Sequence, residues 1–117
     1  LGVFKGESSQ VLIEVFGRDC YLGVDAYNYM DLDYVHVEDI RSFTQKNNFP
    51  CDIVWNDISS WLGSPKSRES ALFWAKRNLV SGGLYIDEGL KNLPRDIDLT
   101  DFELVYLLPS NTVFRKL

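Results

Sequence analysis

Apolar residues recur along this chain with two spacings, one typical of helices and one typical of buried strands. Helical spacing predicts helices over residues 8–16, 39–46 and 64–78. Short apolar runs lie between and after these segments, and they predict strands at 21–25, 34–37, 52–55 and 84–86. We expect Pro65 to begin the last helix and Gly82–Gly83 to end it, because a left-handed turn costs glycine little.

The last part of the chain has a different pattern. Residues 102–108 and 112–117 both resemble strands, and only Pro109, Ser110 and Asn111 separate them. That connection is too short for a parallel crossover, so it predicts an antiparallel hairpin. Strands that alternate with helices indicate a parallel sheet covered on both faces. The sequence therefore predicts an α/β fold: a Rossmann-like, mostly parallel sheet with helices on both faces and a C-terminal antiparallel hairpin.

Composition narrows the class of protein. The 117 residues are 45% hydrophobic and 25% charged, which suits a single globular domain over 1–117. The net charge of -5, without a basic stripe, argues against a nucleic-acid partner. No signal peptide or membrane-length apolar run is visible, so we expect a cytoplasmic protein without a membrane partner. Cys20 and Cys51 lie in apolar segments, which favours buried free thiols over a disulfide.

Polar residues, most of them acidic, follow each of the four predicted parallel strands. They are Asp25, Glu38–Asp39, Asn56–Asp57 and Asp87–Glu88. The carboxyl ends of parallel strands share one edge of the sheet, where ligands bind in such folds. Any one of these acids is explained equally well as a helix cap or a solvated turn. Four in succession predict a polar rim that binds a ligand.

The start of the chain adds a glycine-containing loop to this rim. Gly2 and Gly6 precede the helix that is expected to begin near Ser8. Glycines let the backbone pass close to a ligand, and a helix N-terminus presents free N–H groups. The next strand ends in Asp25, and an acid at that point can accept hydrogen bonds from both hydroxyls of a ribose. Together these features predict a nucleotide cofactor.

In order and spacing, these segments resemble the motifs of class I, S-adenosylmethionine-dependent methyltransferases. The matching segments are the G-x-x-x-G loop in 1–8, the second motif in 21–27, the third in 37–40, the fourth in 51–57 and an L-x-x-G-G-x-x-x-x-D approach to the fifth strand in 78–88. Small-molecule O-methyltransferases and the cephalosporin-hydroxylase-like branch are the most similar in character. Each motif is degenerate alone, and it is their shared order that carries the resemblance.

The resemblance implies roles for individual residues. The methionine part of the cofactor would be bordered by Gly2, Phe4, Gly6, Glu7 and Ser8. Asp25 would bind the ribose with Ala26 and Tyr27 beside it, while Asp39 and Ile40 would flank the adenine. Asn56 and the catalytic Asp57 would face the sulfonium and the acceptor. In metal-dependent members three acids hold Mg²⁺, and the matching residues are Asp57, Asp87 and Glu88.

The chain also departs from the family pattern. In the family's strand order, 3-2-1-4-5-7-6, a central strand precedes the glycine loop; the sequence begins after that position, so we expect a fragment of a longer protein. Residues 58–61 contain no histidine, which argues against a histidine base there. The single histidine, His36, reads as a packed or hydrogen-bonded strand residue. Four basic residues read as the solvated side of a helix: Lys66, Arg68, Lys76 and Arg77.

Three functions are compatible with these observations. The leading hypothesis is methyl transfer from S-adenosylmethionine to a small-molecule acceptor, on oxygen, by an enzyme whose main task is to position the two reactants. An NAD-binding Rossmann domain is an alternative, although the loop lacks a compact G-x-G-x-x-G. A truncated or non-catalytic domain that binds a nucleotide or a protein partner is the third. The sequence leaves open whether the protein forms a homo-oligomer.

Overall fold

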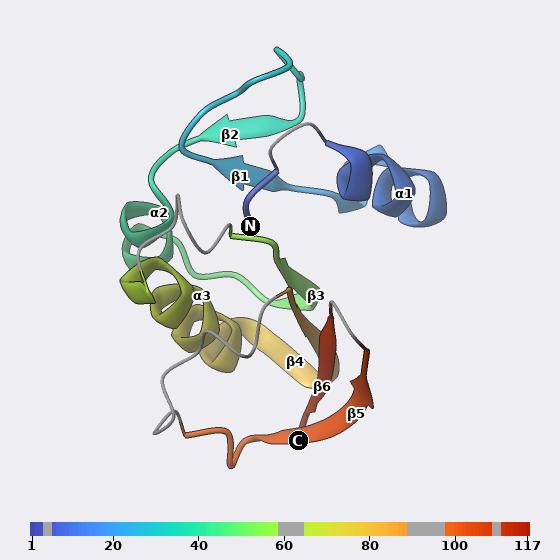
Figure 1. The fold of residues 1–117 in the computed structure, drawn as a ribbon, viewed down its shortest axis with the longest axis vertical. Helices are drawn as coiled ribbons and strands as arrows, with labels where there is room; N and C mark the ends of the chain where they lie inside the picture. The colour runs from blue at the N-terminus through green and yellow to red at the C-terminus, as the bar shows by residue number, and fades with distance from the viewer. Residues whose placement is uncertain (4–5, 59–64, 89–97, 109–110) are drawn as a thin grey trace.

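The computed structural model describes residues 1–3, 6–58, 65–88, 98–108 and 111–117 (Figure 1). Its helices are α1 (Glu7–Phe16), the 3-10 turn η1 (Arg18–Cys20), α2 (Ile40–Lys46) and α3 (Pro65–Asn78). Its strands are β1 (Gly23–Asp25), β2 (Val35–Val37), β3 (Cys51–Asn56), β4 (Leu79–Asp87), β5 (Phe102–Leu107) and β6 (Thr112–Lys116). Each predicted helix and strand therefore has a counterpart, with ends displaced by a few residues.

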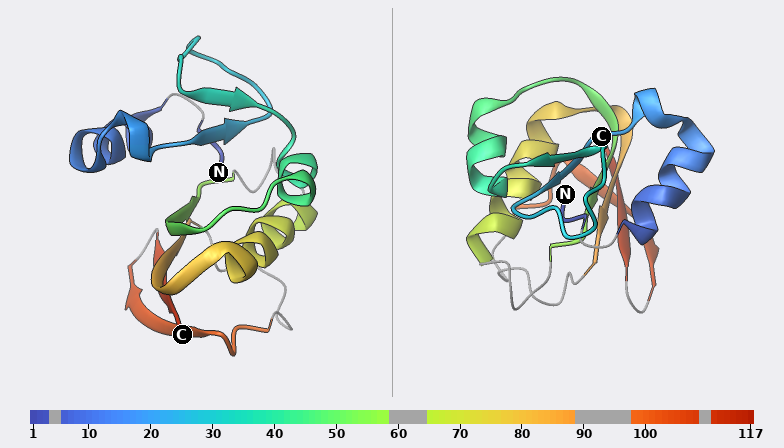
Figure 2. Two further views of the ribbon diagram at one scale, coloured as in Figure 1. Left: turned by 180° about the vertical axis from the view of Figure 1, so that it is seen from behind. Right: turned by 90° about the horizontal axis from the view of Figure 1, so that it is seen from above.

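The strands form two hydrogen-bonded groups. β1 pairs in parallel with β2, and a four-stranded group has the order β3-β4-β6-β5. β3 and β4 are parallel, whereas β6 is antiparallel to both of its neighbours, so β5 again runs in the direction of β4. α2 and α3 pack together on one side of the strands, and α1 lies on the other side (Figure 2). The predicted α/β class, the mostly parallel strands and the helices on both faces are confirmed.

The start of the chain lies between the two groups of strands. The Leu1 nitrogen donates to the Trp55 carbonyl (2.6 Å), and the Leu1 carbonyl accepts from the Asp57 N–H (2.8 Å). On the other side, the Gly2 N–H donates to the Val24 carbonyl (2.9 Å). Leu1 and Gly2 therefore bridge the carboxyl ends of β1 and β3, as Figure 1 shows at the label N. Within the described ranges, no strand pairs with the rest of these two facing edges.

The core lies mainly between α3 and the β3–β4 pair. α3 buries the face predicted from its spacing, with Ala71, Leu72 and Ala75 fully enclosed. They pack in one cluster with Val54 of β3 and Tyr85 of β4. Burying a large apolar side chain stabilises a fold by about 1.5–3 kcal/mol, so this cluster fixes α3 against both strands. The position of α3 matters because it carries a residue of the candidate site.

α3 ends at Asn78, as predicted, but the prediction that Gly82–Gly83 end it is wrong. β4 begins at the residue after Asn78, so the two glycines lie inside the strand. The Asn78 side chain closes the helix, because its amide donates to the Trp74 carbonyl (2.9 Å) and its oxygen accepts from the Phe49 N–H (2.9 Å). Gly82, with φ of 82°, occupies an irregularity of β4, where the pairing shifts from Cys51↔Leu79 to Ile53↔Leu84.

The remaining predictions about the fold are met in part. Neither cysteine forms a disulfide; Cys51 is partly buried, whereas the prediction of a buried thiol is wrong for Cys20, which is exposed. β5 pairs antiparallel with β6, while residues 109–110 of the expected turn lie outside the described residues. Among the helices that the structure describes, none combines the length and the apolar character that a membrane crossing requires.

Candidate functional site

The glycine-containing loop and the end of β1 are joined by one carboxylate. Asp25 Oδ2 accepts from the Val3 N–H (2.8 Å), and Oδ1 accepts from the Tyr27 N–H (3.2 Å). Ala26 lies between these contacts, at the turn that leaves the strand. Asp25 therefore stands at the carboxyl end of β1, directly beside the loop, as its expected ribose-binding role requires.

Gly2 and Gly6 both adopt left-handed backbone conformations, with φ of 80° and 82°. A Cβ atom at Gly2 would come within 2.6 Å of the Asp57 carbonyl oxygen, and one at Gly6 within 2.5 Å of the Tyr34 hydroxyl. Close packing within the protein thus explains both glycines without a ligand. α1 begins at Glu7, followed by Ser8, so its free N–H groups lie next to Gly6. Phe4 lies outside the described residues.

An exposed aromatic segment follows Asp25. The side chains of Tyr27, Tyr29 and Met30 are 66%, 49% and 55% exposed, and the two tyrosine rings lie 5.7 Å apart. Aromatic side chains are costly to leave in water, and a flat ligand such as a purine can cover them. The chemistry of this end of β1 therefore fits a nucleoside: a carboxylate for hydroxyl groups and aromatic rings for a base.

Asp39 and Ile40 have structural roles. Asp39 Oδ1 accepts from the N–H groups of Arg41 (3.1 Å) and Ser42 (3.2 Å), so it is the N-cap of α2. The Ile40 side chain is buried in the core beside Phe43. The structure thus places Asp39 on the rim, where its carboxylate serves as a cap, but turns the Ile40 side chain away from the rim.

Asn56 and Asp87 lie beneath the rim in a buried polar cluster. Neither side chain is exposed, and the Asn56 amide donates to Asp87 Oδ2 (3.0 Å) and to the Tyr85 hydroxyl oxygen (3.0 Å). The Tyr85 hydroxyl in turn donates to the same Asp87 oxygen (2.7 Å). Burial raises the pKa of Tyr85 well above its usual value, and the negative charge of Asp87 adds to this shift. These residues hold the ends of β3 and β4 together rather than facing a ligand.

Arg68 completes the cluster, and its predicted solvated position is wrong. The residue is 3% exposed, and its guanidinium donates to Asp87 Oδ1 (3.2 Å), to the Glu88 carbonyl (2.9 Å) and to the Ile58 carbonyl. The sequence does contain a signal for this: residues 68, 71, 72 and 75 have the i, i+3, i+4, i+7 spacing of one helix face. An arginine on that buried face requires a buried acid, which is Asp87.

Asp57 and Glu88 lie on the rim directly after this cluster. The Glu88 N–H donates to the Asn56 carbonyl (3.0 Å), which fixes the two acids side by side at the ends of β3 and β4. Partial burial raises the pKa of Asp57 to about 7, and a hydrogen bond from its carboxyl group to Glu88 and the charge of Glu88 add to this shift. Asp57 therefore exchanges a proton near neutral pH, which is what a general base needs.

The fold was compared with those of known proteins. Over 98% of its length, the chain superimposes on 82% of SMU.1697c, a candidate methyltransferase from Streptococcus mutans crystallised with S-adenosylhomocysteine, with a TM-score of 0.61 and 14% identity. The chain shares the fold of this protein. Another candidate methyltransferase, yhhF of Escherichia coli, aligns with 70% of the chain and 47% of its own, with a TM-score of 0.47 and 16% identity. No protein-family model and no curated protein sequence matches the chain.

The fold does not bring the three expected magnesium ligands together as a metal site. Asp87 uses one oxygen for Arg68 and the other for Asn56 and Tyr85. In the described part of the chain, no three histidine, cysteine or acidic side chains are grouped so that they could hold a metal ion. A buried guanidinium beside Asp87 also supplies the positive charge that a cation would bring. The donor set therefore does not fit Mg²⁺, and we derive no metal-dependent step.

His36 contacts Glu38, one of the acids that follow β2. Its Nε2 atom is 2.9 Å from Glu38 Oε2, on an exposed part of β2. Hydrogen bonds from His36, Ser42 and Lys46 lower the pKa of Glu38 to about 2. His36 is thus a hydrogen-bonded strand residue, which is one of the two interpretations that the sequence allowed.

Proposed function

We propose that this protein is an S-adenosylmethionine-dependent methyltransferase that methylates an oxygen atom of a small molecule, with Asp57 as the general base. The observation that carries the proposal is that two acids lie at the carboxyl ends of β1 and β3, both beside the glycine-containing loop. Asp25 ends β1 and accepts from the Val3 N–H of the loop, and Asp57 follows β3 and lies next to Gly2 of the same loop. A cofactor bound along this loop would have its ribose near Asp25 and its reacting end near Asp57.

The cofactor supplies an electrophilic methyl group, and the chain's own residues supply position and a proton acceptor. Asp25, with the exposed rings of Tyr27 and Tyr29 next to it, would hold the nucleoside. The partly buried Asp57 carboxylate would accept the proton of an acceptor hydroxyl, and Glu88 would share that proton through the hydrogen bond between the two acids. A hydroxyl is the natural acceptor for such a base, because its oxygen becomes a good nucleophile only as the proton leaves.

The first test is calorimetric titration with S-adenosylhomocysteine and, separately, with NADH. We expect binding of the first ligand and none of the second. Asp25→Ala should weaken binding at least about tenfold, because a lost charge-assisted hydrogen bond is worth about 1.5–3 kcal/mol. Glu14→Ala, which removes an exposed acid from the middle of α1, should leave affinity unchanged. Tight binding of NADH, or unchanged affinity in Asp25→Ala, would refute the site assignment.

Catalysis is tested by formation of S-adenosylhomocysteine with a panel of phenols, carboxylic acids and amines. Asp57→Asn should reduce turnover on hydroxyl acceptors about 10²-fold or more while cofactor affinity stays nearly constant, as expected for loss of a general base. Asp52→Asn, at the opposite end of the same strand, is the matched control. Cofactor binding without turnover on any acceptor would favour the non-catalytic alternative.

A further inference from the structure

The chain segments that carry the two rim acids Asp57 and Glu88 meet at one buried side chain, that of Arg68 in α3. A single guanidinium nitrogen, Arg68 Nη2, donates both to the Glu88 carbonyl (2.9 Å) and to the Ile58 carbonyl. The first carbonyl belongs to one rim acid, and the second belongs to the residue that directly follows the other. Besides its ion pair with Asp87, Arg68 therefore joins the backbone after β3 to the backbone after β4.

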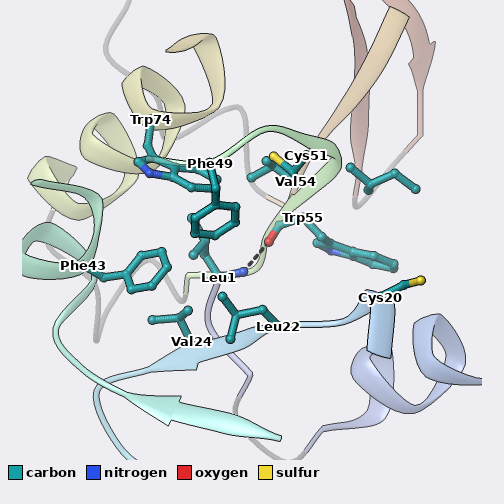
Figure 3. A pocket seen from close by; sticks show the side chains of 11 residues that line it. Leu1, Cys20, Leu22, Val24, Phe43, Phe49, Cys51, Val54, Trp55 and Trp74 are labelled. Carbon is teal, nitrogen blue, oxygen red and sulfur yellow. Dashed lines mark hydrogen bonds between the residues drawn. The ribbon is translucent and has the colours of Figure 1, made fainter. Parts of the chain in front are cut away.

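The backbone around Asp57 is held on its other sides as well. The Asp57 N–H donates to the Leu1 carbonyl (2.8 Å), and the Leu1 nitrogen donates to the Trp55 carbonyl (Figure 3). On the far side of Asp57, the Ile58 N–H donates to Asn56 Oδ1 (3.3 Å). Peptide groups before and after Asp57 are thus fixed by hydrogen bonds, so this backbone forms a firm support for the side chain.

The relative orientation of the two segments decides whether the two acids touch. The Glu88 N–H donates to the Asn56 carbonyl (3.0 Å), and this hydrogen bond alone would let the segments turn about it. Arg68 supplies a second link between them, which fixes how they are turned. Burial, then the hydrogen bond to Glu88 and its charge, raise the pKa of Asp57 to about 7. The positive charges of the Leu1 amino group and of Arg68 act in the opposite direction.

We propose that Arg68 is a positioning residue for the general base, because it holds the segments of Asp57 and Glu88 so that their carboxyl groups stay in contact. The inference rests on the proposed role of Asp57. A planar guanidinium has donors in fixed directions, so it can bind one carboxylate and two carbonyls at once, whereas the ammonium group of lysine is a point charge on a flexible stem. Neutralising Asp87 requires the charge of Arg68, but holding the two acids together requires its shape.

The deciding experiment is an NMR titration of the Asp57 carboxyl carbon in protein labelled with ¹³C-aspartate, without cofactor or acceptor. Arg68→Lys keeps the positive charge but cannot hold both carbonyls. We expect the midpoint of the Asp57 titration, about 7 in the wild type, to fall toward that of an isolated aspartate, because the two carboxyl groups move apart. Arg77→Lys is the matched control and should leave the midpoint unchanged, since Arg77 lies on the same helix and donates to the Thr44 carbonyl (3.2 Å).

A second variant separates positioning from stability. Arg68→Met, Asp87→Asn removes the buried ion pair without leaving a lone charge. Glu88→Gln should lower the Asp57 midpoint in the wild type, because the hydrogen bond to Glu88 and its charge raise the Asp57 pKa. The same substitution should change the midpoint much less in the double variant, where the two acids are no longer held together. An equal response to Glu88→Gln in both backgrounds would mean that Arg68 serves stability alone.

Turnover measures the consequence for catalysis. Arg68→Lys should lower kcat on a hydroxyl acceptor at least about tenfold, because a misplaced base is a poor one, while affinity for S-adenosylhomocysteine stays constant. A wild-type titration of Asp57 in Arg68→Lys overturns the inference, and so does a wild-type protein whose Asp57 titrates as an isolated carboxyl group. Failure of the proposed function has a different signature: no turnover on any acceptor, with the effect of Arg68 on the Asp57 titration still present.

Discussion

At the scale of single residues, the protonation of Asp57 links stability to pH. Its pKa is about 7 in the folded protein and 3.8 in the reference state, so the folded protein binds this proton more tightly than the unfolded chain does. The contribution of Asp57 to the free energy of unfolding is therefore greatest below about pH 4, is lost as pH rises, and is gone above about pH 7. The loss should be about 1–2 kcal/mol, less than the unscreened shift implies, because the side chain is only half-buried.

Urea unfolding of the wild type and of Asp57→Asn between pH 4 and pH 8 isolates this contribution. The free energy of unfolding of the wild type should fall relative to that of the variant up to about pH 7 and then stay constant. Asp52→Asn, which removes an exposed acid from the same strand, is the control for the loss of one carboxylate. A difference between wild type and Asp57→Asn that rises with pH would mean that the Asp57 pKa is lowered, and Asp57 would lose its place as the base.

Sequence reasoning located the acids of the site but not their surroundings. The alternation of strands and helices placed Asp25, Asp57 and Glu88 at strand ends, because that pattern is local. It could not separate the rim acids from Asp87, which is fully buried. That distinction depends on Arg68, nineteen residues earlier in α3 and brought to Asp87 only by packing. The roles implied for the cofactor-binding residues remain predictions until binding is measured.

At the scale of elements, Arg68 joins α3 to the ends of β3 and β4. Arg68→Ala leaves the buried Asp87 carboxylate without its cation, and breaking a buried pair in this way costs about 3–5 kcal/mol. Urea unfolding should show this loss, whereas Lys66→Ala, at an exposed position of the same helix, should change stability by less than about 0.5 kcal/mol. The double variant Arg68→Met, Asp87→Asn should recover part of the loss. Equal effects of Arg68→Ala and Lys66→Ala would contradict the buried ion pair.

Substitutions of Asp39 can show whether this strand-end acid caps α2, contacts the cofactor or does both. Asp39→Ala removes the N-cap of α2 and should destabilise the protein by about 1 kcal/mol. Asp39→Ser keeps a capping oxygen and should restore most of that stability. If Asp39 also flanks the adenine, Asp39→Ser should still bind S-adenosylhomocysteine more weakly than the wild type in calorimetry. Full affinity in the serine variant would assign Asp39 to capping alone.

The junction of α3 and β4 shows why the cause of a helix end is harder to predict than the helix. Sequence reasoning ended this helix at Asn78 but assigned the stop to Gly82–Gly83, because adjacent glycines usually end a helix. In the structure Asn78 itself closes α3, since its side chain contacts a carbonyl of its own helix and the N–H of Phe49. A residue 29 positions away therefore helps to set the boundary, and no local pattern contains that information.

At the scale of the whole molecule, the two groups of strands differ in how firmly they are held. β3 and β4 pack against α3, and β4 also pairs with the antiparallel β6, whereas β1 and β2 have three residues each and β2 is largely exposed. Leu1 and Gly2 make the described contacts between the carboxyl ends of β1 and β3. The resemblance implied a central strand at this position, before the glycine-containing loop. It did not show that Leu1 and Gly2 would bridge the two strand ends.

This difference predicts that the β1–β2 pair opens without unfolding of the rest. Native-state hydrogen exchange should give a lower opening free energy for the Gly23 and Glu38 amides, whose N–H groups join the β1 and β2 segments, than for those of Val54 and Tyr85, which should exchange only by global unfolding. Low concentrations of urea should steeply lower the opening free energies of the Val54 and Tyr85 amides, because global opening exposes far more surface. They should lower the opening free energies of the β1–β2 amides only slightly. Gly2→Ala should weaken the contacts of Gly2 with the end of β3, because the new Cβ would lie 2.6 Å from the Asp57 carbonyl oxygen and push Asp57 away. This variant should accelerate exchange in β1 and β2 selectively. Equal protection in both strand groups, unchanged in this variant, would show instead that the molecule opens as one cooperative unit and that Leu1 and Gly2 suffice to join the two halves of the sheet.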